Sequence, residues 1–243
     1  MRFKYPFLEV LADIQPLTDK VVLVGGWAPT VYFEYLWKNT STPFLTEDID
    51  FGLTKEMTVA RPLEEQFDLK KYSRKHLHLG KEKPYQLMLG DIPIDFLADK
   101  SNHDIIAKKI LGRGIILNVS QGYNFLLHDS IVVRCEKLNV RVPHPARYIL
   151  HKILVYLQNQ KTRAHDIAIA YYTLSRSPFQ NDILKEMKKL EKTATGRFVR
   201  CELPKFCENK NSSACLDIQK LFLEVGIRES PDTLFKDLQK IFD

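Results

Sequence analysis

The 243-residue sequence lacks several features that would assign it to a class directly. No apolar run reaches the roughly 18 residues that a membrane-spanning helix needs. The first residues, MRFKYPFLEVLADIQ, have neither the apolar core nor the cleavage site of a signal peptide. Repeats and low-complexity tracts are also missing. With 44% hydrophobic residues and a net charge of +6, the chain is not disordered, and we expect a folded, cytoplasmic protein with no membrane partner.

Cysteine is scarce, and its spacing does not suggest a metal site. The four cysteines are Cys135, Cys201, Cys207 and Cys215. The last three form C-x5-C-x7-C without a C-x2-C pair or a nearby histidine, so a zinc site is not expected. The sequence instead predicts reduced, partly buried thiols.

The positive net charge favours acidic partners such as nucleotides or RNA. The densest basic cluster is KKYSRKHLHLGKEKP, residues 70–84, in which aromatic residues are interleaved. A solvated loop and helix face explains this cluster at least as well as a nucleic-acid patch.

The two parts of the chain differ in their hydrophobic patterns, which predicts an α+β protein. Residues 1–143 mix short apolar strands with helices, and residues 144–243 are almost entirely helical in pattern, with a boundary at the Pro143-His144-Pro145 turn. We therefore expect a mixed sheet with flanking helices, followed by an all-helical C-terminal domain. The expected strands are 21–26, 48–53, 85–89, 92–99, 132–136 and 139–143, and the main expected helices are 7–14, 27–38, 146–157, 164–174 and 181–192, with two more beyond residue 213.

Two acids lie in the apolar stretch DIDFGL, residues 48–53. Residues i and i+2 of a strand point to the same side, so Asp48 and Asp50 project together while Ile49 and Phe51 pack on the other side. Two carboxylates this close repel each other, and a divalent cation removes the conflict. Mg²⁺ suits such a site because it takes oxygen ligands and binds through one or two carboxylates plus substrate phosphates.

Asp95 adds a third acid, in the apolar stretch IPIDFLAD. An aspartate among apolar strand residues is costly unless it is paired or bound to a metal. If the strand from residue 92 lies beside the strand from residue 48, the three carboxylates converge. The other interpretation places Asp95 at a strand edge or in a pair with a lysine.

The glycine pair Gly25-Gly26 follows the strand VVLV. Glycines at this point let the backbone turn and bring N–H groups close to an anion at the start of the next helix. A tight turn that binds no ligand is the alternative.

The order of these elements resembles the DNA polymerase β nucleotidyltransferase superfamily. LVGGWA (23–28) and TEDIDF (46–51) are similar to the signature of its bacterial stand-alone members, including abortive-infection nucleotidyltransferase toxins. The resemblance covers about residues 8–100 and extends more loosely to residues 146–175. Trp27 departs from the pattern, since many members carry a small residue there.

The resemblance implies roles for residues at the matching positions. It implies nucleotide-phosphate contacts by Gly25, Gly26 and Thr46. It implies two bound Mg²⁺, with Mn²⁺ as an alternative, held by the catalytic acids Asp48, Asp50 and Asp95.

Two helical stretches, PARYILHKILVY (145–156) and KTRAHDIAIAYYTL (161–174), are similar to a later part of the family pattern. They imply that Lys152 lies near the nucleotide phosphates and that Asp166 is a supporting acid. An ordinary surface lysine fits the position of Lys152 as well.

The implied function is Mg²⁺-dependent transfer of a nucleoside monophosphate from an NTP, such as ATP, to an acceptor hydroxyl, with release of pyrophosphate. The acceptor is a transfer RNA or other RNA, a protein or a small molecule, and residues 144–243 form its side of the site. The toxin-like branch implies a cognate antitoxin as a further partner. Two alternatives remain. One is a non-catalytic nucleotidyltransferase-like module that serves in binding or as part of a toxin–antitoxin pair. The other is a metal-dependent phosphohydrolase or nuclease.

Overall fold

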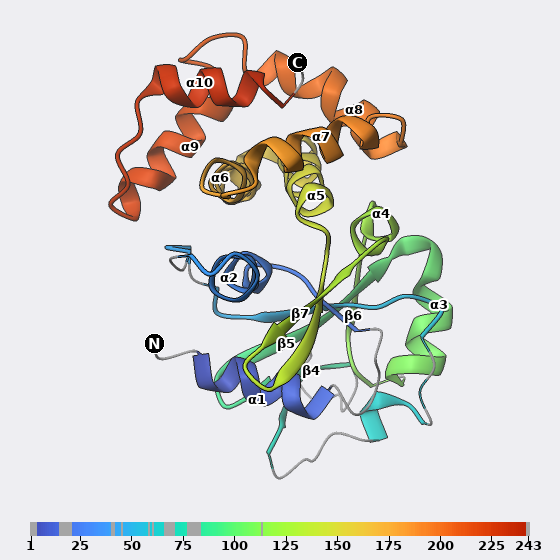
Figure 1. Ribbon diagram of the computed structural model, residues 1–243. Coiled ribbons are helices and arrows are strands. Elements are labelled where there is room, and N and C mark those ends of the chain that lie inside the picture. The colour runs from blue at the N-terminus through green and yellow to red at the C-terminus, as the bar shows by residue number, and fades with distance from the viewer. Residues whose placement is uncertain are drawn as a thin grey trace. The chain divides into compact units, whose positions relative to one another are not determined.

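The chain forms two compact units in a computed structural model that describes residues 4–14, 21–39, 42–44, 46–57, 59, 61–65, 71–76, 84–112 and 114–241. The first unit comprises Met1–Thr40 and Leu45–Pro143, and the second comprises Ser41–Phe44 and His144–Asp243. The first contains a mixed sheet with flanking helices and the second is helical, which confirms the α+β class (Figure 1). Among the described residues, no helix has the length and apolar character that crossing a membrane requires.

The first unit is built from short elements. Its strands are β1 (Val22–Leu23), β2 (Ile49–Gly52), β3 (Ser73–His76), β4 (Tyr85–Leu89), β5 (Ile92–Asp99), β6 (Leu117–Ser120), β7 (Ile131–Cys135) and β8 (Leu138–Val142). Its helices are α1 (Lys4–Ile14), α2 (Trp27–Thr30), α3 (His103–Ile106) and α4 (Tyr123–Leu127), with π-helical segments at Val31–Leu36 and Ala107–Leu111 and 3₁₀ turns at Leu63–Glu65 and Lys100–Asn102.

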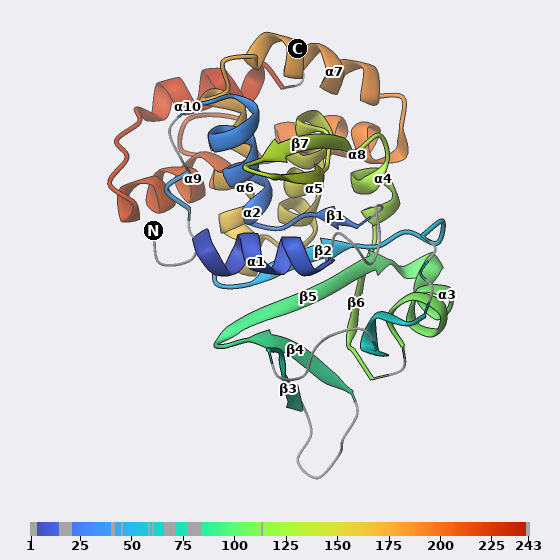
Figure 2. The same ribbon diagram turned by 60° about the horizontal axis from the view of Figure 1, so that its bottom comes forward.

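Strand β5 is the centre of the main sheet. The strand order is β1-β2-β5-β4-β3, and β6 also pairs with β5 (Figure 2). The β2–β5 and β5–β6 pairs are parallel, and the other pairs are antiparallel. One layer of apolar side chains is buried, formed by Ile49 and Phe51 of β2 and Ile94, Phe96 and Ala98 of β5. Phe51 lies directly opposite Phe96, with ring centroids 6.0 Å apart. This apolar layer keeps the two strands in register, so the alternate residues meet on the other side.

The structure differs from the sequence-based elements in several places. The sequence did not predict β6, α3, α4 or the helix over residues 194–202. Regular strand structure in β1 stops at Leu23, and Gly25 turns the chain with a positive φ of 60°. The helix expected over 27–38 starts as α2 and widens into the π-helical segment Val31–Leu36. Residues 73–76, expected as part of a solvated loop and helix face, form the exposed edge strand β3. Residue 70 and residues 77–83 of that basic cluster lie outside the described residues.

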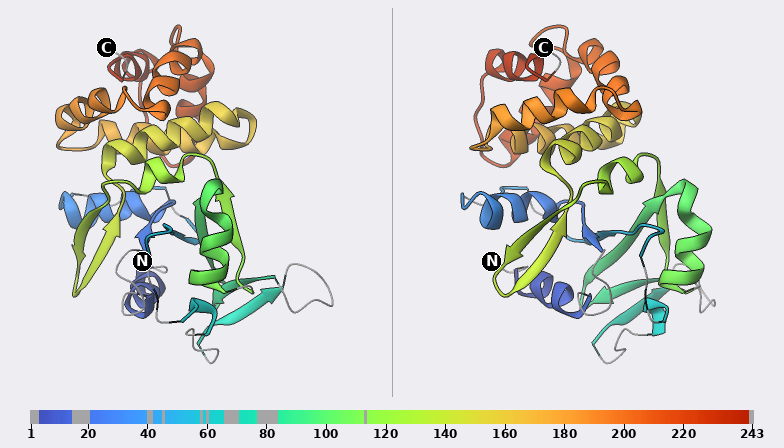
Figure 3. Two further views of the ribbon diagram at one scale, coloured as in Figure 1. Left: turned by 90° about the vertical axis from the view of Figure 1, so that its right-hand side faces the viewer. Right: turned by 45° about the vertical axis from the view of Figure 1, so that its right-hand side comes forward.

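The second unit is a set of packed helices. They are α5 (Pro145–Gln158), α6 (Gln160–Ser175), α7 (Gln180–Leu190), α8 (Ala194–Glu202), α9 (Ser213–Glu224) and α10 (Pro231–Gln239), with a 3₁₀ turn at Leu203–Phe206. Helices α5 and α6 lie side by side (Figure 3). Within α6, Arg163 has non-helical angles, which matches the sequence-based start of this helix at residue 164.

A short segment from the first third of the chain belongs to the helical unit. Phe44 is buried, and its ring lies 5.4 Å from that of His165, 5.5 Å from that of Tyr172 and 6.0 Å from that of Phe222. These contacts join residues 42–44 to α6 and α9, an arrangement that the local hydrophobic pattern did not predict.

Candidate active site

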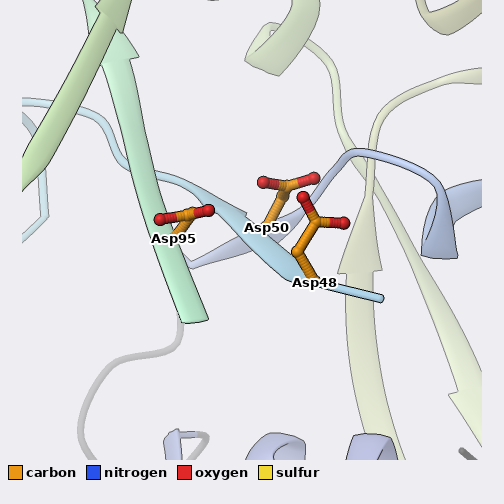
Figure 4. Close-up of side chains that lie close together, drawn as sticks. All are labelled: Asp48, Asp50 and Asp95. Carbon is orange, nitrogen blue, oxygen red and sulfur yellow. The ribbon is translucent and has the colours of Figure 1, made fainter. Parts of the chain in front are cut away.

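Asp48, Asp50 and Asp95 converge on one side of the sheet. Asp50 and Asp95 are direct neighbours across the parallel β2–β5 pair, and Asp48 lies two residues before Asp50. One carboxylate oxygen from each lies within 4.8 Å of the others, and all three residues are partly buried (Figure 4). The sequence predicted this meeting on the condition that the two strands pair, and the register confirms that condition.

The glycine turn packs against these acids. A Cβ atom on Gly25 would overlap Oδ2 of Asp50 and lie 2.7 Å from its Cγ. The backbone amide of Val24 also donates to the carbonyl oxygen of Asp50, at 2.9 Å. Only glycine allows both the positive φ and this close approach, so the turn and the acid occupy one compact site.

Thr46 connects the second glycine to the first acid. Its hydroxyl donates to Oδ1 of Asp48, and a Cβ atom on Gly26 would lie 2.7 Å from the Cβ of Thr46. Thr46 therefore packs on the glycine turn while its hydroxyl orients the Asp48 carboxylate.

Asp95 lies next to two side-chain amide groups. Its Oδ1 accepts hydrogen bonds from Nε2 of Gln86 at 2.8 Å and from Nδ2 of Asn118 at 3.4 Å. Burial raises the pKa of the Asp95 carboxyl above its ordinary value, and the negative charge of Asp48 acts in the same direction, while the two amide donors oppose it. A nearby positive charge would therefore favour the ionised form of Asp95.

The donor set fits a divalent cation that prefers oxygen. The three residues offer three carboxylates and no sulfur or imidazole, which suits Mg²⁺ or Mn²⁺ better than zinc. Three partly buried negative charges repel one another, and a bound cation relieves both the repulsion and the burial cost.

Lys152 and Asp166 form an ion pair within the helical unit. Nζ of Lys152 lies 2.6 Å from Oδ1 of Asp166, with side chains 17% and 7% exposed. The pair joins α5 to α6. His151, beside Lys152, is buried, and burial lowers its pKa to about 3, with the charge of Lys152 acting in the same direction. The roles that the resemblance implies for Lys152 and Asp166 stay predictions.

Trp27, the residue that departs from the family pattern, has a packing role. Its ring stacks on that of Phe7 from α1, with centroids 4.2 Å apart and an interplanar angle of 3°. The large side chain thus joins the first helix to the helix that follows the glycine turn. Sequence reasoning had no signal for this pair, because it joins positions that no local period relates.

Sequence reasoning also missed Gln86 and Asn118. Both are amides on strands, a residue type that usually indicates an exposed position. One signal was available: Gln86 interrupts the apolar run YQLML, four residues before the turn that leads to Asp95.

The three convergent carboxylates beside the glycine turn could hold a divalent cation, which is the kind of ion that many enzymes acting on phosphates use. The family model described as nucleotidyltransferase matches residues 4–176, which is most of the chain. The chain therefore belongs to this nucleotidyltransferase family and is a transferase of phosphorus-containing groups that uses a nucleoside triphosphate. No curated protein matches the chain. The matched region includes the three acids, the glycine turn and helices α5 and α6.

Proposed function

We propose that the protein transfers a nucleoside monophosphate from an NTP to an acceptor hydroxyl and releases pyrophosphate. The observation that carries this proposal is the register of β2 and β5, which makes Asp50 and Asp95 neighbours and completes a three-carboxylate cluster with Asp48. The glycine turn against Asp50 supports it, because backbone N–H groups beside a metal site suit a triphosphate.

Each residue of the site has a role in this proposal. Asp48, Asp50 and Asp95 hold two Mg²⁺, with Mn²⁺ as a substitute, and Asp95 accepts the proton of the acceptor hydroxyl. Two such ions would activate the attacking oxygen and neutralise the leaving pyrophosphate. Gly25 and Gly26 contact the phosphates through their backbone, and Thr46 holds Asp48 in place beside them.

The helical unit supplies the remaining parts of the proposal. Lys152 binds nucleotide phosphates, and Asp166 holds its ammonium group in position. We propose that residues 144–243 contribute the acceptor-binding surface, that ATP is the donor and that RNA is the acceptor, which the net charge of +6 favours. Cytoplasmic action within the toxin-like branch, with a cognate antitoxin, is the biological setting that the sequence motif suggests.

The test is a transfer assay with each α-labelled NTP, Mg²⁺ and separate pools of RNA, protein and small metabolites. Label moves to one pool, and pyrophosphate is released in equal amount. Replacement of Asp48, Asp50 or Asp95 by asparagine lowers the rate about 1,000-fold, because losing one metal ligand removes roughly 4 kcal/mol of transition-state stabilisation. Asp91→Asn is the matched control, since Asp91 is an exposed acid in the β4–β5 turn outside the cluster.

The same variants separate a chemical role from a structural one. Without metal, each asparagine variant unfolds at a temperature equal to or above that of the wild type, because one repulsive charge is gone. Release of phosphate or nucleotide fragments in place of pyrophosphate would identify a hydrolase. Mg²⁺-dependent NTP binding by calorimetry without any transfer would identify a binding module.

A further inference from the structure

Asp95 lies where strand β5 changes its partner. Along one edge of β5, residues Ile92–Ile94 pair with β4 and residues Phe96–Asp99 pair with β6. Asp95 falls between these two stretches, so its side chain is reached from both neighbouring strands. Gln86 approaches from β4 and Asn118 from β6.

Both amides donate to the same oxygen atom of Asp95. The Nε2–Oδ1 distance is 2.8 Å for Gln86, and the Nδ2–Oδ1 distance is 3.4 Å for Asn118. We propose that Gln86 and Asn118 are positioning residues which occupy Oδ1 of Asp95 and leave the lone pairs of Oδ2 for the metal and the acceptor proton. This inference rests on the proposed metal-dependent function.

The chemistry of the two donors supports this assignment. A carboxylate can rotate and can bind a cation through one oxygen or both, and Mg²⁺ requires near-ideal octahedral geometry at short distances. Two N–H donors on Oδ1 restrict that rotation and disfavour two-oxygen binding. Partners of this kind commonly affect metal affinity by 10- to 100-fold in other proteins.

The neutral character of the donors matters as much as their position. A lysine or arginine at either place would orient Asp95 equally well, but its charge would repel the cations that the cluster attracts. Amides hold the carboxylate and leave the negative charge of Asp48, Asp50 and Asp95 available. This combination distinguishes Gln86 and Asn118 from the ordinary ion-pair partners of a strand aspartate.

The test measures binding of Mn²⁺ alone to the full chain by electron paramagnetic resonance, without nucleotide. The variants are Gln86→Met, Asn118→Leu, both together, and Asp95→Asn. Gln121→Met is the matched control, because Gln121 is an exposed amide just after β6. We expect Gln86→Met to weaken Mn²⁺ binding about 10-fold, the double variant to approach Asp95→Asn, and the control to bind like the wild type.

Thermal unfolding of the metal-free variants shows whether each still folds, and the line shape of bound Mn²⁺ reports a changed ligand geometry directly. If Asp95→Asn loses Mn²⁺ while the double amide variant binds like the wild type, the positioning role is overturned and the proposed function stands. If the wild type binds no Mn²⁺, the proposed function fails and this inference fails with it.

Discussion

Gly25 and Asp50 are packed so closely that no side chain fits between them. The φ angle of Gly25 is 60°, and a Cβ atom there would overlap the Asp50 carboxylate. The backbone of the proposed phosphate-binding turn and the central acid of the cluster are therefore held by one contact. A side chain introduced at Gly25 would therefore displace the Asp50 carboxylate.

We predict that Gly25→Ala abolishes Mn²⁺ binding and nucleotidyl transfer, because the methyl group displaces Asp50. Gly90→Ala is the matched control: Gly90 has a φ of 58°, and nothing lies within 4 Å of a Cβ atom placed there. Backbone strain costs about 1–2 kcal/mol in both variants, and urea denaturation should show a further loss in the Gly25 variant, where the methyl group overlaps Asp50. Only the Gly25 variant loses metal and activity, and equal loss in both variants would contradict the steric explanation.

Trp27 stabilises the first unit through Phe7, and we expect Trp27→Ala to lower the free energy of unfolding by about 3 kcal/mol. Trp27→Phe preserves a stacked ring and retains activity, since the role is packing. A double-mutant cycle of Trp27→Leu with Phe7→Leu should give a coupling of about 1 kcal/mol. Additive effects in urea denaturation would show that the stacking makes no contribution.

Variants of the Lys152–Asp166 ion pair can distinguish a role in stability from a role in nucleotide binding. Lys152→Met leaves the buried Asp166 carboxylate without this partner and should destabilise the protein by about 2–3 kcal/mol. The double variant Lys152→Met, Asp166→Leu recovers most of that stability, because no buried charge is left over. We expect its KM for the NTP to stay raised about 10-fold, which corresponds to one lost phosphate contact of about 1.4 kcal/mol. A normal KM in the double variant would assign the pair to structure alone.

His151 makes stability depend on pH. Its folded-state pKa is lowered to about 3, whereas an unfolded histidine titrates near about 6.5, so the unfolded chain binds the proton more tightly. Stability is therefore complete above about pH 6.5 and declines as the pH falls toward 3, by about 2 kcal/mol at pH 5.

The measurement is urea denaturation at pH 7.5 and pH 5.0 for the wild type and His151→Leu, which cannot titrate at this position. His165, whose pKa is also lowered mainly by burial, contributes in the same direction and is present in both proteins. The variant should lose most of the pH dependence. An unchanged difference between the two pH values would exclude His151 as its cause.

Some features of the site and the fold could be predicted from the sequence because they depend only on residues that are close together in the chain. The alternation of Asp48 and Asp50 with Ile49 and Phe51 requires both acids to share one side of a strand. The glycine pair after an apolar strand requires a turn, and the change in hydrophobic period near residue 143 separates the sheet-containing part from the helical part. Each of these features is encoded within a few residues.

The remaining features depend on which distant segments meet. The pairing of β2 with β5 makes Asp95 a neighbour of Asp50, and a shift of one residue would turn Asp95 to the opposite side. The stack of Trp27 on Phe7, the burial of Phe44 among α6 and α9, and the two amides on Asp95 likewise join positions that no period relates. Composition and periodicity determine on which side of its helix or strand a residue lies. Long-range packing alone determines which distant residues it contacts.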